Sequence, residues 1–140
     1  MIEENIKRLG IKSVTTIPYE KVEKEFHDLG LFDRVLLDVP CSNTGVLSKR
    51  IEVRFRITQT AIKKITKTQL KLLELAVKFL KPNGKICYST CSIQPEENNK
   101  VIEKFLHTHK KFELETKKLT LPSAEKSDHD GGYVAIIRQK

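Results

Sequence analysis

Residues 32–42 read FDRVLLDVPCS, a nearly continuous apolar run that ends in an aspartate and a Pro-Cys turn. Such a run is typical of a strand covered on both faces, so we expect a strand at Phe32–Asp38. A second run of the same kind, residues 85–90, is followed directly by Cys91. In an open parallel sheet, ligands bind outside the carboxyl ends of the strands. Two thiols, Cys41 and Cys91, are therefore expected at one edge of the sheet, which suggests covalent chemistry.

Helices and strands alternate along the rest of the chain. Apolar residues at helical spacing predict a long helix over 58–80, with Thr58 or Thr60 as its N-terminal cap, and a turn at 80–84 that ends it. This order predicts an α/β protein, the second half of a doubly wound, mostly parallel sheet with helices on both faces. The other expected elements are helices at Ile2–Leu9 and Pro95–Leu106, a short helix or turn at Val22–Phe26, and strands at Ser13–Ile17, Phe112–Leu119 and Gly132–Arg138.

The composition indicates one domain and free thiols. The chain has 140 residues, of which 39% are hydrophobic, and this length suits a single domain with one core. We find neither an apolar run of the ~18 residues that a membrane span needs nor a secretory signal, which predicts a cytoplasmic protein. Three cysteines in such a chain indicate reactive or buried thiols instead of a disulfide framework. Cys87, within a strand, is expected to pack.

The net charge of +8 favours a polyanionic partner. A lysine-rich solvated surface explains the same charge equally well, and the two interpretations stay open. One denser stretch, residues 49–56, interleaves cations with apolar residues and could contact phosphates. No metal site is predicted, because His107 and His109 are two residues apart at a helix end and do not face each other.

Cys91, Cys41 and Asp38 are the side chains best placed for a catalytic role. Cys91 precedes an expected helix start at 95–97, whose partial positive charge would lower the pKa of the thiol and favour the nucleophilic thiolate. Cys41 lies at the same sheet edge with no helix directly behind it. Asp38 ends a hydrophobic strand, where a carboxylate is costly to bury, so a functional role is favoured.

Two sequence segments resemble the motifs of a known family. Residues 38–46, DVPCSNTGV, and residues 88–93, YSTCSI, followed by PEEN at 95–98, resemble motifs IV and VI of the RNA cytosine-5 methyltransferases of the Sun/Nol/Nop type. The resemblance covers essentially the whole chain. It implies a Rossmann-like fold, S-adenosylmethionine as the cofactor, and ribosomal or transfer RNA as the partner.

The resemblance also implies a mechanism and residue roles. Cys91 would add to carbon 6 of the cytosine as the nucleophile, and Cys41 would assist product release. Cys41 is the alternative attacker, because DNA cytosine methyltransferases use their Pro-Cys cysteine. Asp38 would lie near the cofactor and could hydrogen-bond the target base, and Pro40 would also line the cofactor site.

The resemblance implies one partial catalytic domain over residues 1–140. The family's glycine-rich cofactor loop and N-terminal RNA-binding domain do not occur in this sequence. A partner chain or self-association is expected to cover the open sheet edge. An alternative function is a noncatalytic RNA-binding or subunit module, and a thiol-redox protein is disfavoured because Cys87 and Cys91 do not form a Cys-x-x-Cys pair.

Overall fold

The chain divides into two units, Met1–Gly30 and Leu31–Lys140. The computed structural model describes residues 1–22, 30–124 and 129–140. The first unit holds two short helices, α1 (Ile2–Arg8) and α2 (Tyr19–Val22). α1 confirms the predicted N-terminal helix, whereas the helix or turn predicted at Val22–Phe26 falls mainly outside the described residues.

The strand predicted at Ser13–Ile17 is wrong. These residues are described, but they belong to no strand. A strand needs a neighbour that pairs with its backbone N–H and C=O groups. The sheet that the described residues form includes no partner for this segment, so its β-branched composition alone does not make it a strand.

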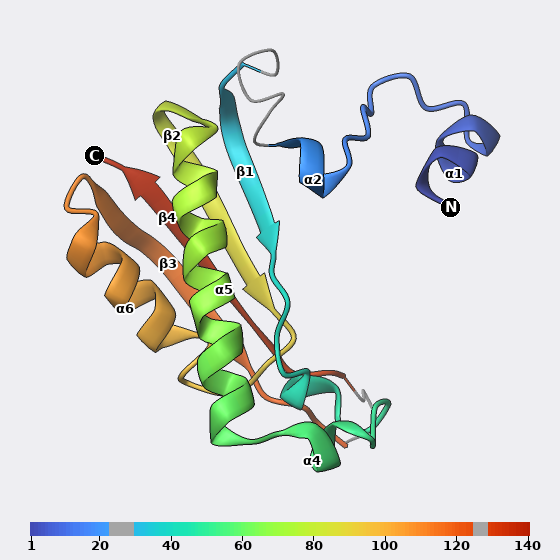
Figure 1. The fold of residues 1–140 in the computed structure, drawn as a ribbon, viewed down its shortest axis with the longest axis vertical. Helices are drawn as coiled ribbons and strands as arrows, with labels where there is room; N and C mark the ends of the chain where they lie inside the picture. The colour runs from blue at the N-terminus through green and yellow to red at the C-terminus, as the bar shows by residue number, and fades with distance from the viewer. Residues whose placement is uncertain (23–29, 125–128) are drawn as a thin grey trace. The chain divides into compact units, whose positions relative to one another are not determined.

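The second unit is built on a four-stranded sheet in the order β1-β2-β4-β3 (Figure 1). β1 and β2 are parallel, and β4 runs antiparallel to both β2 and β3. The predicted strand at Phe32–Asp38 is confirmed to the residue, and the strands predicted near the C-terminus are confirmed within one residue. The strands are β1 (Phe32–Asp38), β2 (Leu80–Thr90), β3 (Phe112–Thr120) and β4 (Gly132–Gln139).

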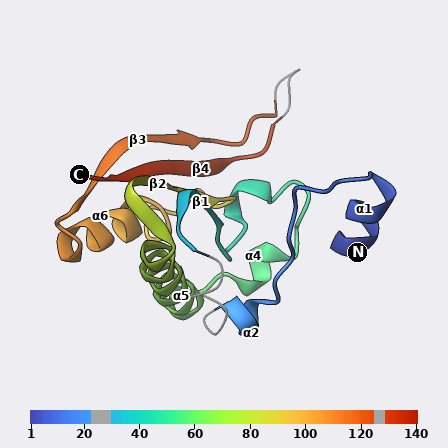
Figure 2. The ribbon, with the colours of Figure 1, turned by 90° about the horizontal axis from the view of Figure 1, so that it is seen from above.

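Two helices, α5 (Gln59–Lys78) and α6 (Asn99–Thr108), lie against the same face of this sheet (Figure 2). Thr58 caps α5 as predicted, because its side-chain oxygen accepts a hydrogen bond from the backbone N–H of Ala61 at 3.1 Å. No helix that the structure describes is long and apolar enough to cross a bilayer.

The core lies between the sheet and these two helices. Alternate residues of the central strands, Ile86 and Tyr88 of β2 and Ile137 of β4, are completely buried, as the two-residue period of a strand requires. They pack against Leu73 of α5 and Phe105 of α6, which are also buried. The core therefore fixes β2, from which Cys91 follows.

β1 is the edge strand of the described sheet, and this changes one expectation. Leu36 in its centre is 70% exposed, whereas a strand covered on both faces was predicted. The reason is that α5 and α6 cover the same face of the sheet (Figure 2), whereas Leu36 alternates with the core-packing residues Val35 and Leu37 and so lies on the opposite face, in register with Cys87 of β2. The neighbours Val35 and Leu37 pack on the core, so one side of β1 is anchored.

Two element starts differ from prediction. α6 begins at Asn99, not at Pro95, because residues 95–98 form a turn in which Asn98 leaves helical geometry at φ −108° and ψ −102°. The turn predicted at 80–84 lies within β2, where Asn83 has a positive φ of 63°. The register there advances from Leu80 to Lys85 while β1 advances by two residues, so the extra residues bulge out of the ladder.

We expect the change of Ile86 to Ala to lower the free energy of unfolding by about 2–5 kcal/mol, because it leaves a cavity in the core. Leu36→Ala is the matched control on the neighbouring strand, and its exposed side chain should cost less than about 0.5 kcal/mol. Urea unfolding followed by circular dichroism measures both. Equal losses would contradict the assignment of the core to one face of the sheet.

Candidate active site

The parallel pairing of β1 and β2 brings the two cysteine loops together. Asp38 at the end of β1 is in register with Ser89 of β2, and the N–H of Val39 continues the ladder to the Ser89 carbonyl at 3.2 Å. The chain then turns, and the Sγ atoms of Cys41 and Cys91 lie 3.1 Å apart. The predicted meeting of these two thiols at one sheet edge is therefore what the structure shows.

Asn43 lies between the thiols as a shared hydrogen-bond acceptor. Its Oδ1 is 2.8 Å from Sγ of Cys91 and 3.5 Å from Sγ of Cys41, so each thiol can donate to it. Its backbone is left-handed, with φ 61°, a conformation that asparagine tolerates better than most residues. The sequence indicates a turn former here, but the contact with both thiols has no local sequence signal.

A buried carboxylate holds the two loops in place. Glu97 is fully buried, and its Oε1 and Oε2 accept the backbone N–H of Ser42 at 3.2 and 3.0 Å. The backbone carbonyl of Glu97 in turn accepts the buried hydroxyl of Tyr88 at 2.6 Å. A carboxylate buried in this way is stabilised by charge-assisted hydrogen bonds to N–H donors. Sequence reasoning missed this role, because it placed Glu97 in the first turn of a helix.

Hydroxyl groups form a second link between the loops. Oγ1 of Thr44 lies 3.0 Å from Oγ of Ser92, and it accepts the backbone N–H of Ile93 at 3.0 Å. Asn98 completes the link on the β2 side, since its Nδ2 donates to the Ser92 carbonyl and its Oδ1 accepts the hydroxyl of Thr90. The position of Cys91 is thereby fixed on both sides by satisfied polar groups.

Gly45 is required by a close approach of three segments. Its N–H donates to the Cys91 carbonyl at 2.9 Å, and its carbonyl accepts the N–H of Gly131 at 2.8 Å. A Cβ at position 45 would lie only 2.2 Å from the Gly131 carbonyl oxygen, a distance no side chain tolerates. The loop before β4 thus supports the cysteine loops directly.

Gln69 supports the Pro-Cys turn from α5. It is completely buried, and its Nε2 donates to the backbone carbonyl of Pro40 at 3.0 Å. Its Oε1 has no hydrogen-bond partner among the described residues, an unusual state for a buried amide oxygen.

The electrostatics of the pair keep a proton on Cys41. Burial, followed by the hydrogen bond with Cys91, raises the pKa of Cys41 to about 12. This thiol is therefore protonated at neutral pH and can act as a proton donor. Burial also raises the pKa of Cys87, which lies within β2 in register with Leu36 and Ile136. The dipole argument for Cys91 loses its basis, because the helix expected at 95–97 starts at Asn99.

All four residues predicted from the sequence line one pocket of about 380 Å³. Asp38 and Pro40 are exposed, and the two cysteines are partly buried. Their assigned roles remain predictions. Val39 and Asn43 complete the lining, so the pocket residues are Asp38, Val39, Pro40, Cys41, Asn43 and Cys91.

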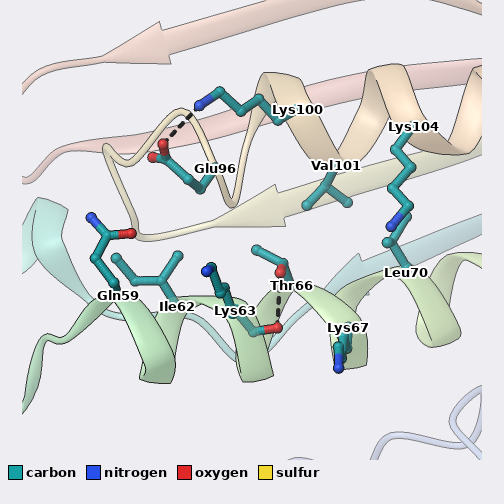
Figure 3. Close-up of a pocket in the computed structure, with 10 residues that line it drawn as sticks. All are labelled: Gln59, Ile62, Lys63, Thr66, Lys67, Leu70, Glu96, Lys100, Val101 and Lys104. Atoms are coloured by element: carbon teal, nitrogen blue, oxygen red, sulfur yellow. Dashed lines mark hydrogen bonds and ion pairs between the residues drawn. The ribbon is translucent and has the colours of Figure 1, made fainter.

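A larger cavity, of about 500 Å³, lies elsewhere, in the groove between α5 and α6 (Figure 3). Lysines from both helices line it, and one of them, Lys100, forms an ion pair with Glu96 at 2.8 Å. No cysteine lines this groove. Among residues 1–22, 30–124 and 129–140, no three His, Cys, Asp or Glu side chains gather where they could hold a metal ion.

Comparison with known proteins identifies close similarities over nearly the whole chain. A family model described as 16S rRNA methyltransferase RsmB/F matches residues 1–137. The chain is 40% identical over 116 residues to the probable ribosomal RNA small subunit methyltransferase B of Coxiella burnetii, a match that covers 81% of this chain and 27% of that protein. A match to ribosomal RNA small subunit methyltransferase B of Salmonella arizonae is 37% identical and covers 75% of this chain and 24% of that protein.

Two solved structures share the fold of this chain. The structure of NSun6 from Pyrococcus horikoshii with SFG superposes with a TM-score of 0.73 at 28% identity, over 99% of this chain and 38% of that one. The structure of PH0851 gives a TM-score of 0.81 at 31% identity, over 99% of this chain and 34% of that one. The predicted Rossmann-like α/β class is confirmed. The chain spans about a quarter of the length of the first two relatives named above.

We expect Glu97→Ala to destabilise the fold by about 1–3 kcal/mol, because it leaves the Ser42 N–H without its acceptor. Glu97→Gln retains an acceptor oxygen and should cost less. Glu96→Ala is the matched control, since this half-buried neighbour forms a surface ion pair with Lys100 among the described residues and its loss should have little effect. Urea unfolding measures all three. A loss of unfolding free energy for Glu96→Ala as large as that for Glu97→Ala would contradict the role of the Glu97 carboxylate in holding the two loops together.

The raised pKa of Cys41 predicts slow alkylation at moderate pH, because the thiolate is the reactive form. Iodoacetamide labelling of Cys41, read by peptide mass spectrometry, should keep rising through about pH 10, whereas an ordinary thiol levels off above its pKa of about 9.0. In Cys91→Ala the profile of Cys41 should move to lower pH, because one cause of the shift is removed. A wild-type profile that levels near pH 9 would contradict the raised pKa of Cys41.

Proposed function

This chain belongs to the 16S rRNA methyltransferase RsmB/F family, and from that membership we propose that it methylates carbon 5 of a cytosine in RNA through a covalent cysteine adduct. The observation that supports this most is the pair of thiols 3.1 Å apart at the carboxyl ends of two parallel strands. Ribosomal RNA is the substrate that the family name favours, and transfer RNA is the other candidate.

We propose further that residues 1–140 form part of one catalytic domain. The match of the family model runs across both units, from residue 1 to residue 137. The chain spans only about a quarter of the length of these relatives. That it carries the activity of the full-length relatives is therefore proposed.

Asp38 and Pro40 are proposed to contact the cofactor. S-adenosylmethionine, when bound, supplies the methyl group and carries positive charge on its sulfur and its amino group. The pocket beside the cysteines suits this chemistry, because it is open and presents an exposed carboxylate, Asp38, at the end of β1. A carboxylate there would attract the positively charged groups of the cofactor.

Cys91 is proposed as the nucleophile. Its thiolate would form a bond to carbon 6 of the cytosine, and the electron pair of the C5–C6 double bond would move to carbon 5, which is otherwise a weak nucleophile. After methylation, the proton on carbon 5 leaves to a base, the double bond forms again, and the bond from Cys91 to carbon 6 breaks. The target base must leave its stack to reach the thiol.

Cys41 is proposed to assist the release of the product. Its raised pKa keeps it protonated, and it lies beside Cys91, so it can share its proton with the departing sulfur. The reverse assignment, with Cys41 as the attacker, places a poorly ionised thiol in the nucleophilic role. Asp38 is proposed to hydrogen-bond the ring as it gains electron density.

The outer edge of β1 is proposed to be covered by a partner chain or by a second copy of this chain. As the edge strand of the described sheet, β1 presents a row of backbone groups that can pair further.

RNA that contains 5-azacytosine tests the roles of the two thiols, because it traps the covalent adduct. With S-adenosylmethionine present, we expect Cys41→Ala to form an adduct that maps to Cys91, and Cys91→Ala to form none. Denaturing electrophoresis and peptide mass spectrometry provide the readout. Ser42→Ala, beside Cys41, serves as the control and should still form the adduct. An adduct with Cys91→Ala but not with Cys41→Ala would reverse the assignment.

A further inference from the structure

A basic segment next to the cysteine loop has no role in the chemistry above. We define the arginine segment as residues 49–56, which comprise a turn and the short helix α4 (Val53–Arg56). Val53 is buried and anchors the segment, whereas Arg50, Arg54 and Arg56 are exposed. Within the part of the chain that the structure describes, no acidic side chain pairs with any of these three arginines. Their guanidinium groups are available to an anionic partner.

An exposed aromatic ring lies among these cations. Phe55 is 87% exposed, and it stands between Arg54 and Arg56 in the sequence. Exposed aromatic rings combined with arginines are the composition that binds single-stranded nucleic acid, because bases stack on the ring and the cations hold the phosphates.

The arginine segment is continuous with the thiol site. A cavity of about 290 Å³ has Cys41 and Asn43 in its lining together with Arg50 and Arg56. Cys41 and Asn43 also line the pocket that holds Asp38. Cys41 and Asn43 therefore line two cavities, one that also includes Cys91 and one that also includes the arginines.

The groove between α5 and α6 lacks this continuity. Lys63, Lys67 and Lys104 line it, and they too have no acidic partner among the described residues, but no cysteine lines the groove (Figure 3). It also lacks an aromatic ring on which a base could stack. These lysines provide an equal charge at a different place and make a matched control.

We propose that the arginine segment binds the single-stranded RNA that flanks the target cytosine. Arg50, Arg54 and Arg56 contact phosphates, and Phe55 stacks on a base. This inference rests on the proposed function, since it takes RNA as the substrate. To the proposed function it adds two points: which protein surface binds the RNA, and that this RNA is single-stranded.

The test measures binding of a fluorescent single-stranded RNA to the full 140-residue chain by anisotropy over a range of salt concentrations. The variant with Arg50→Gln, Arg54→Gln and Arg56→Gln should bind at least about tenfold more weakly, and the slope of log affinity against log salt should fall by about 2, for three lost phosphate contacts. Phe55→Ala should bind roughly 5- to 100-fold more weakly with little change in this slope, and Phe55→Trp should restore affinity.

The control variant carries Lys63→Gln, Lys67→Gln and Lys104→Gln, and it should bind within about twofold of the wild type despite the same loss of charge. Equal weakening by the two triple variants, tighter binding of duplex RNA, or no RNA binding at all would overturn the inference. Unchanged urea midpoints exclude unfolding as the cause, because all the substituted side chains are exposed.

The outcome is separable from that of the proposed function. Loss of the Cys91 adduct with arginine-dependent RNA binding intact would overturn the covalent chemistry and support the binding surface. If the Cys91 adduct forms but the triple arginine variant binds RNA as tightly as the wild type, the covalent chemistry is supported and the proposed binding surface is overturned.

Discussion

The pairing of β1 with β2 is the constraint on which the site depends. The two strands are parallel, and Leu37 pairs with Tyr88 and Asp38 with Ser89. They therefore end side by side, and the loops that follow them have to meet. Only the β2 side of this pair is buried in the core. β1 is held by that pairing and by the side chains that it places on the helices, so the thiol geometry depends on an edge strand. The polar links between the loops compensate for this exposure, above all the carboxylate of Glu97 on the Ser42 N–H.

The sequence predicted those features whose causes are local. Strand β1 is predicted to the residue because its apolar run is bounded by Asp38 and Pro40, and α5 begins at the threonine whose hydroxyl can cap it. The convergence of Cys41 and Cys91 was also predictable, because it requires only that two strands be parallel neighbours.

The features that were missed depend on partners far apart in the chain. Ser13–Ile17 has strand composition, but a strand also needs a neighbour to pair with, which composition cannot reveal. The start of α6 moved to Asn99 because the side chains of Glu97 and Asn98 bind residues around the cysteine loops instead of capping a helix. The contact of Asn43 with both thiols likewise arises only when two loops, 48 residues apart in the chain, are folded together.

The contact between Gly45 and Gly131 makes the thiol site sensitive to a remote part of the chain. A carbonyl of the Pro-Cys loop is held by the backbone that enters β4, with no side chain that could adjust between them. An inserted or deleted residue next to Gly131 would move this backbone and, through Gly45, displace the sulfur pair. The distance between the two sulfurs therefore depends on the backbone geometry of a junction that lies about 40 residues beyond Cys91 in the chain.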